Sequence, residues 1–187
     1  MAHETLKTRE DLTLQKETGM KYFIIIDMQN DFTTGALRNE AATSNIRAIA
    51  DKAAELKAQG YTIIATRDTH HSDYLQTQEG RNLPVEHCIE NTAGWQVAEE
   101  IIPHIDKYVD KPSFGYADWR DVIGEAPEAI AMCGTCTAIC VASNFTILKA
   151  TYRETPITIY KDLCACLTKE THNAAITVMQ TQQAIIE

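Results

Sequence analysis

The sequence predicts a single-domain α/β protein of the three-layer αβα type, with a mainly parallel central sheet. Short runs rich in β-branched residues alternate with segments of helical periodicity from residue 21 onward. This alternation is typical of parallel sheets whose two faces are covered by helices. The length of 187 residues fits one domain, and no internal repeat points to a solenoid.

The expected elements follow one another in a regular order. Short apolar runs predict buried strands at residues 21–27, 61–66, 108–109, 128–133 and 156–160. Helices are expected at about 41–59, 92–102, 137–152 and 168–180, with a helical turn near 117–123. The first helix rests on apolar residues at helical spacing and on Gly60 as a stop signal. Residues 67–91 are polar and His-rich, which is typical of a loop.

The composition narrows the class of protein and its partners. Residues 1–19 are polar without a clear strand, so we expect an N-terminal extension ahead of a domain at 20–187. No apolar run approaches the roughly 20 residues of a membrane span, and the N-terminus lacks the apolar core of a secretory signal. The net charge of −9 argues against nucleic acid or an anionic membrane as a partner. Six cysteines then indicate chemistry or metal binding in a reducing cytoplasm.

Four polar or loop-forming positions come directly after predicted strands. These positions are Asp27, Asp68, Lys111 and Gly134. In open parallel sheets, sites form at the carboxyl ends of the strands. We therefore expect the four positions to converge on one edge of the sheet.

Three of the six cysteines fall within eight residues, at Cys133, Cys136 and Cys140. The segment runs from a strand to a helix through a Gly-Thr turn, so Cys140 is expected in the first helical turn. Free N–H groups and the positive end of the helix dipole favour a thiolate there, and can stabilise an oxyanion. The alternative is a buried structural cysteine, since free cysteine is among the most buried residue types. Cys133 is expected in the core, while Cys136 could take either role.

A second group of polar residues lies in the His-rich loop. Asp68 and His70 are two residues apart, which places their side chains on the same side of an extended segment. A further carboxylate and histidine could complete a site for zinc, manganese or iron. A solvated loop without a metal is the alternative.

Three motifs together resemble those of the isochorismatase-like cysteine hydrolases. They are IIIDMQNDF at 24–32, VDKPSFGYADW at 109–119 and GTCTAICV at 134–141, in the family order. The resemblance implies an isochorismatase-like hydrolase fold with Asp27 as acid/base, Lys111 as its catalytic partner and Cys140 as nucleophile. It also implies oxyanion donors at the backbone N–H groups of Cys136 and Cys140, a cis peptide at Thr135–Cys136, and a homo-oligomer.

The His-rich loop is most similar to that of the nicotinamidase branch. This resemblance implies a divalent metal, with zinc first, held by Asp68, His70, Glu79 and His87. Gln76 stands where many relatives have a further histidine, and Glu79 best matches a glutamate used by some bacterial members. The implied reaction is hydrolysis of nicotinamide to nicotinate and ammonia through a cysteine thioester, for NAD salvage. Phe32, Phe114 and Trp119 are candidates for sandwiching the ring, although each could equally be core.

Two positions depart from the family pattern. Ala138 replaces an acidic residue two positions before the nucleophile, and Cys166 stands where relatives commonly have glycine. These departures leave open a related amidohydrolase acting on a ureido, carbamoyl or other small amide, or a non-catalytic relative. Isochorismate cleavage is an ether hydrolysis that does not need the cysteine, so we do not expect it.

Overall fold

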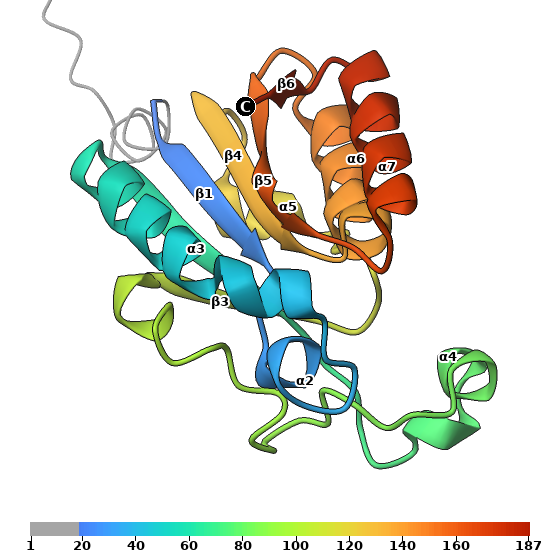
Figure 1. Cartoon of the computed structure of the whole chain (residues 1–187). Helices are drawn as coiled ribbons and strands as arrows, with labels where there is room; N and C mark the ends of the chain where they lie inside the picture. Colours follow the sequence, from blue (N-terminus) through green and yellow to red (C-terminus); the bar gives the residue numbers. More distant parts are fainter. Residues whose placement is uncertain (1–18) are drawn as a thin grey trace, which may run out of the picture.

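The computed structural model describes residues 19–187 of the chain (Figure 1). The expected extension at residues 1–19 therefore falls, except for Gly19, outside the described residues. Within them, a six-stranded sheet has the order β3-β2-β1-β4-β5-β6, and every neighbouring pair is parallel. The strands are β1 (Lys21–Ile26), β2 (Tyr61–Asp68), β3 (Lys107–Lys111), β4 (Ala129–Thr135), β5 (Ile157–Ala165) and β6 (Ile185–Ile186). The predicted fold class is confirmed.

Helices cover both faces of this sheet. One face is covered by α3 (Glu40–Ala58), and the other by α5 (Trp119–Ile123), α6 (Ala142–Thr151) and α7 (Lys169–Thr181) (Figure 1). The chain winds outward from β1 in one direction and from β4 in the other. Because parallel crossovers are right-handed, the two directions place their helices on opposite faces. The central strand β1 is apolar almost throughout, since both of its faces are buried.

The longer helices begin at the side-chain caps expected for such segments. The Asn39 side chain accepts hydrogen bonds from the backbone N–H groups of Ala41 and Ala42 at the start of α3. Thr168 caps α7 by accepting from the N–H of Thr171. No helix of the described residues is long and apolar enough to cross a membrane.

The predicted helix at 92–102 does not form. The segment consists of turns followed by a short 3₁₀ helix, η2, at Ile102–His104. Its apolar residues pack against the ends of the strands in an irregular conformation, where Val97 bridges to Gln29 and the N–H of Ala98 donates to the carbonyl of Met28. Tertiary hydrogen bonds with the end of β1 thus replace the local helix that periodicity suggested.

Two further differences concern helix type and element length. The predicted helix at 137–152 begins as a π-helical turn, η3 (Thr137–Val141), before α6. The strand β6 has two residues and was not predicted, because such a short run carries no periodicity.

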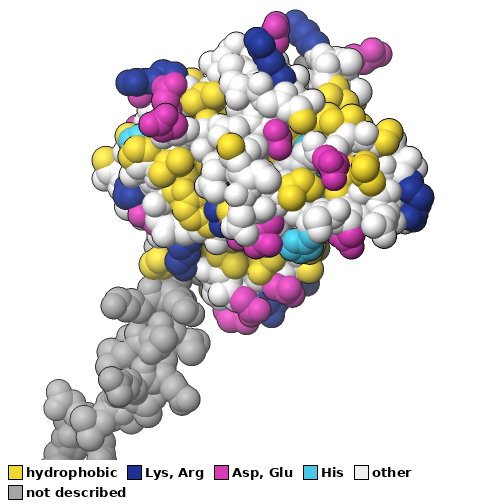
Figure 2. All heavy atoms as spheres, turned by 90° about the horizontal axis from the view of Figure 1, so that it is seen from below, with side chains coloured by type: hydrophobic (Ala, Val, Ile, Leu, Met, Phe, Trp, Pro, Cys, Tyr) yellow, Lys and Arg dark blue, Asp and Glu magenta, His cyan; other side chains and the backbone are white. Residues whose placement is uncertain are grey.

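The carboxyl ends of β1 to β5 lie at one end of the molecule, the lower end in Figure 1. Short elements of the connecting segments gather there: α2 (Asn30–Thr33), the 3₁₀ helix η1 (Tyr74–Gln76) and α4 (Gln78–Asn82). Figure 2 looks onto this end, where hydrophobic and acidic side chains are interspersed and no broad basic patch covers the described residues.

Candidate active site

The register of the sheet places the two central strands unusually close at their carboxyl ends. Ile26 of β1 pairs with Gly134 of β4, whose φ is 120°. A Cβ at position 134 would lie 2.1 Å from the carbonyl oxygen of Ile26. Only glycine fits this position, so the strand ends leading to Asp27 and to the Cys140 segment lie side by side.

Lys111 is completely buried and lies at the centre of a network of polar contacts. Its Nζ is 2.7 Å from Oδ2 of Asp27 and 3.2 Å from Oδ1 of Asp68. It also donates to the Ser113 carbonyl at 3.1 Å and to Sγ of Cys140 at 3.7 Å. One ammonium group thus joins residues that follow or end β1, β2 and β4.

The two carboxylate oxygens of Asp27 differ: Oδ1 accepts a hydrogen bond, and Oδ2 accepts none. Its backbone N–H donates to Oγ1 of Thr66 at 3.1 Å, and this hydroxyl donates to Oδ1 of Asp27 at 2.6 Å. Oδ2 carries the ion pair to Lys111 but has no linear hydrogen bond. Burial raises the pKa of Asp27, although Lys111 opposes this shift. Oδ2 is therefore the oxygen of this carboxylate that is left to accept a proton.

Cys140 lies in η3, at the start of the helix after β4, and is 6% exposed. Burial, followed by the neighbouring Asp27, raises the pKa of its thiol well above the usual value. The resting group is therefore a neutral thiol, which corrects the expectation that the helix end favours a thiolate. In a buried site the loss of solvation exceeds the effect of the helix dipole.

Asn144 fastens the nucleophile segment to the VDKPSFGYADW segment, and sequence reasoning missed it. Its Nδ2 donates to the carbonyls of Cys140 and Phe114, at 2.8 and 3.0 Å. Its Oδ1 accepts from the N–H of Tyr116 and the indole of Trp119. The signal available in the sequence was an asparagine one helical turn after the candidate nucleophile, and its complete burial is seen only in the structure.

A second cluster lies on the other side of Lys111. One ligand atom from each of four side chains lies within 4.8 Å of all the others: Asp68, His70, Glu79 and His87. The two carboxylates hold the imidazoles at the distances expected around a shared centre, with Oδ2 of Asp68 3.2 Å from Nε2 of His70 and 3.8 Å from Nε2 of His87. These are the four residues that the nicotinamidase resemblance implies.

The cluster fits a divalent metal. The buried Nε2 of His70 has no hydrogen-bond partner. The Nδ1 of His87 lies 2.8 Å from the carbonyl of Val85, so it carries the proton and Nε2 presents a lone pair to the cluster. Burial and the charge of Asp68 raise the pKa of Glu79, as expected where carboxylates crowd without a cation. Two imidazoles and two carboxylates suit zinc, manganese or iron.

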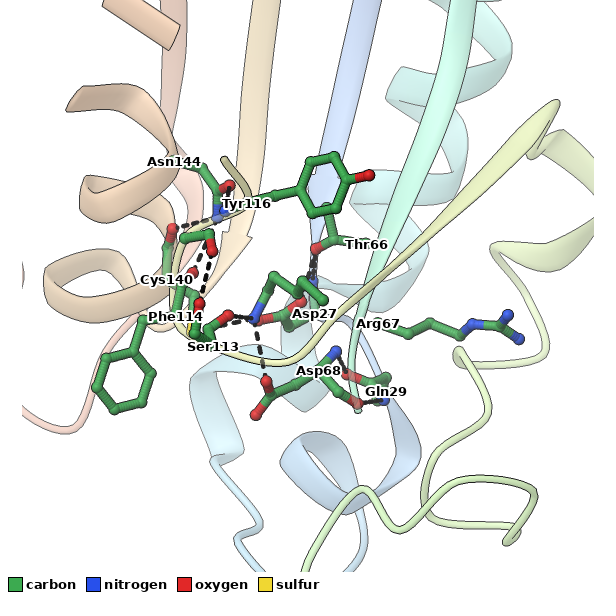
Figure 3. A network of polar contacts seen from close by, with 12 residues as sticks. Asp27, Gln29, Thr66, Arg67, Asp68, Ser113, Phe114, Tyr116, Cys140 and Asn144 are labelled. Atoms are coloured by element: carbon green, nitrogen blue, oxygen red, sulfur yellow. Dashed lines mark hydrogen bonds and ion pairs between the residues drawn. The ribbon is translucent and has the colours of Figure 1, made fainter. Parts of the chain in front are cut away.

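Gln29 positions Asp68 and was not predicted as a site residue. Its amide donates to the carbonyl of Asp68 at 2.9 Å, and its Oε1 accepts from the N–H of Asp68 at 2.7 Å (Figure 3). The same amide donates to the carbonyl of Trp95. Gln29 lies within the first motif, two residues after Asp27, but the motif alone does not reveal which backbone groups it binds.

A pocket of about 520 Å³ opens beside both clusters. Its lining includes Phe32, Phe114, Asp68 and Cys136. Phe32 also packs edge-on against His87, and Phe114 points away from the polar network (Figure 3). Trp119 does not line this pocket, which corrects its candidacy: its side chain is completely buried and its indole donates to Asn144.

The cysteine positions near the nucleophile are now defined. Cys133 is buried in the core, as expected. Cys136 is half-buried in the turn after β4 and lines the pocket, and the peptide bond between Thr135 and Cys136 is cis, as the resemblance implied.

The parallel αβα architecture and the buried Asp–Lys–Cys group together define an α/β protein with a cysteine-centred candidate active site. Comparison with known proteins makes this more specific. The chain belongs to the isochorismatase family, whose domain matches residues 21–187.

Individual relatives are similar at lower levels of identity. A nicotinamidase of Saccharomyces cerevisiae is 30% identical over 123 residues, which cover 49% of this chain and 56% of that protein. The match thus spans little more than half of that relative. A Bacillus subtilis nicotinamidase/pyrazinamidase superposes with a TM-score of 0.79 at 22% identity, covering 89% of this chain and 98% of that one. A Pyrococcus horikoshii pyrazinamidase in complex with zinc gives 0.75 at 22% identity, with the same coverage.

Proposed function

We propose that this protein is a nicotinamidase, which hydrolyses nicotinamide to nicotinate and ammonia. The observation that carries the proposal is the shared position of Asp68, which contacts Lys111 of the Asp–Lys–Cys group and belongs to the four-residue cluster. A carboxamide on a ring with a metal-binding nitrogen could therefore contact both groups at once. The nicotinamidase relatives in yeast and Bacillus subtilis support the same substrate class.

Asp27 and Cys140 carry out the proton transfers. Asp27 accepts the thiol proton on Oδ2, and the resulting thiolate attacks the carboxamide carbon. The C–N bond breaks, and ammonia leaves with the proton returned by Asp27. Water then attacks the thioester carbon as Asp27 accepts its proton, the C–S bond breaks, and Asp27 returns this proton to the leaving Cys140 thiolate. Lys111 keeps Asp27 in place and balances its charge at 2.7 Å.

The backbone N–H groups of Cys136 and Cys140 stabilise the oxyanion in both steps. Both residues belong to the turn and the helix start that follow β4, where N–H groups point toward a bound anion. Phe32 and Phe114 line the pocket and would enclose the nicotinamide ring there.

The residues that would hold the metal are Asp68, His70, Glu79 and His87. When bound, a divalent ion, with zinc as the first candidate, would supply a Lewis-acidic contact for the ring nitrogen. The chain's own contribution is to orient the ligands, through Gln29 on Asp68 and the Val85 carbonyl on His87.

Three further parts of the proposal concern the setting of the enzyme. We propose a cytoplasmic protein acting in NAD salvage, because all six cysteines are free, as is usual in a reducing compartment. We also propose a homo-oligomer, which light scattering of the purified chain would test. A monomer across a wide concentration range would contradict that part alone.

The test is ammonia release by zinc-loaded protein from nicotinamide, pyrazinamide, and acyclic ureido and carbamoyl amides. We expect turnover of the two ring carboxamides and its loss by about 10⁴-fold or more in Cys140→Ala, since nucleophile removal in hydrolases has effects of this order. Cys133→Ala is the matched control, because it removes a neighbouring buried thiol that does not face the site. Turnover of the acyclic amides alone would contradict the nicotinamidase proposal, and no turnover of any amide would contradict an amidase.

A further inference from the structure

A second pair of thiols lies at the same edge of the sheet, outside the Asp–Lys–Cys group. The Sγ atoms of Cys136 and Cys166 are 2.7 Å apart. This distance puts the two thiols in contact with each other. Both residues are half-buried, so the thiols are also within reach of solvent. We propose that Cys136 and Cys166 form a redox-active dithiol, which hydroperoxides oxidise to a reversible disulfide.

The sheet register brings the two cysteines together. Thr135, the last residue of β4, pairs with Ala165, the last residue of β5. Cys136 and Cys166 are therefore the first residues to leave two neighbouring parallel strands. Neighbouring strands lie about 4.8 Å apart, and disulfides typically join Cα atoms about 4.4–6.8 Å apart. Strand ends in this register can therefore carry a disulfide without refolding.

Hydrogen bonds on both sides of Cys136 hold the pair in place. The hydroxyls of Thr135 and Thr137, its two neighbours in sequence, both donate to the carbonyl of Ala165, at 3.4 and 2.9 Å. From the other side, the Asn39 amide donates to the carbonyl of Cys166 at 2.8 Å. The backbone around both thiols is thus fixed before any bond forms, which lowers the entropic cost of closure.

The two thiols differ in acidity in the way that a reactive pair requires. Partial burial opposes ionisation of Cys166, but hydrogen bonds from Cys136 and Thr171 outweigh it and lower its pKa. Burial raises the pKa of Cys136 to about 11. The Thr171 hydroxyl lies 3.4 Å from Sγ of Cys166 and can donate to a thiolate there, so we assign Cys166 as the attacking thiol and Cys136 as the resolving thiol. Cys140 is more deeply buried, and its thiol pKa is raised, so it should react more slowly.

The reaction balances with a hydroperoxide as the oxidant. The Cys166 thiolate attacks one peroxide oxygen, an S–O bond forms, the O–O bond breaks, and hydroxide leaves. The Cys136 sulfur then attacks the sulfenic sulfur of Cys166, an S–S bond forms, and the S–O bond breaks. With the two thiol protons, the products from hydrogen peroxide are one disulfide and two water molecules.

The disulfide would act on the pocket through Cys136. The two sulfurs must approach from 2.7 Å to the roughly 2.05 Å of a disulfide, which shifts a residue that lines the pocket. This consequence rests on the proposed function, in which the N–H of Cys136 stabilises the oxyanion. We expect turnover to fall by about tenfold, less than the 10²–10³ that loss of an oxyanion donor costs.

The test is titration of the full-length, zinc-loaded protein with hydrogen peroxide, followed by peptide mapping without reductant. We expect a Cys136–Cys166 disulfide at peroxide doses that leave Cys140 reduced, and its loss on adding dithiothreitol. The variant Cys166→Ala should keep the basal turnover and lose the peroxide-induced fall. The control Cys164→Ala removes a buried thiol of β5, whose pKa burial raises to about 12, and should still form the disulfide.

Two outcomes would overturn the proposal. Oxidation of Cys140 before any Cys136–Cys166 bond appears would contradict the dithiol site itself. A disulfide that leaves kcat and KM unchanged in an active enzyme would contradict its effect on the pocket. A disulfide formed in protein that hydrolyses no amide would support the dithiol site and count against the proposed function, so the two failures are distinguishable.

Discussion

On each of two sides of Lys111, a buried aspartate contacts its ammonium group, but the other partners of the two aspartates differ. On the β1 side, the carboxylate of Asp27 meets one ammonium and one hydroxyl, and the same ammonium contacts the Cys140 thiol. On the β2 side, the carboxylate of Asp68 meets the same ammonium and two imidazoles. Burial raises the pKa of Asp27, whereas at Asp68 the contacts with His70 and Lys111 outweigh burial and lower the pKa. Two buried carboxylates therefore have pKa values shifted in opposite directions, because their partners differ.

The largest effect is expected for Asp27→Asn, which removes the proton acceptor and leaves the second side intact. We expect the rate of amide hydrolysis to fall by about 10²–10⁴-fold, the usual contribution of general acid–base catalysis. Lys111 keeps Asp68 and the Ser113 carbonyl as partners, so the chain should fold. Zinc content by mass spectrometry should match that of the parent. Loss of zinc together with activity would contradict this prediction, because it would show that Asp27 also supports the metal cluster.

The reciprocal change, Asp68→Asn, should act on the metal. The variant loses the carboxylate that Asp68 contributes to the four candidate ligands. Changes to groups that only orient the ligands lower metal affinity by about 10–100-fold, so we expect zinc affinity to fall by at least this much. Competition with a chromophoric chelator measures the affinity. Zinc binding equal to that of the parent would remove Asp68 from the ligand set.

A smaller effect is expected for Gln29→Ala, which leaves all four ligands in place. The variant loses three hydrogen bonds that hold the backbone of Asp68 and the carbonyl of Trp95. We expect a fall in zinc affinity of about 10–100-fold, because outer-shell groups orient the ligands. The control is Gln96→Ala, an exposed glutamine that follows Trp95. Equal zinc affinities for the two variants would contradict a positioning role for Gln29.

The smallest effect is expected for Thr66→Val, and it should appear in the pH profile. The Thr66 hydroxyl lowers the pKa of Asp27 through its hydrogen bond, so its removal raises that pKa further. Asp27 must be ionised to accept the thiol proton, and activity is lost as pH falls through its pKa. The acid limb of kcat/KM should therefore move to higher pH. Thr62→Val, on the same strand, should leave the limb in place, and an unmoved limb in both variants would exclude Asp27 as the titrating group.

Much of the site could be predicted from the sequence because polar residues interrupt apolar strands at fixed places. Asp27 and Lys111 stand out where buried runs end, and parallel strands bring such ends together. The parallel sheet followed from the alternation of strands and helices, and the resemblance of three motifs assigned Cys140 as the nucleophile. By contrast, the predicted helix at 92–102 and the expected role of Trp119 were wrong. An apolar pattern indicates burial, but does not say against which neighbour a residue is buried.

The sequence by itself determined the fold class, the sheet-edge position of the site and the residue types available there. Periodicity and strand ends are local properties, so they can be recognised in the amino-acid sequence alone. Only the tertiary structure decided which partner each group meets. Gln29 binds the backbone of Asp68, 39 residues away, and Cys136 meets Cys166, 30 residues away. Such pairs depend on the register between strands that are distant in sequence, and register is a property of the packed sheet.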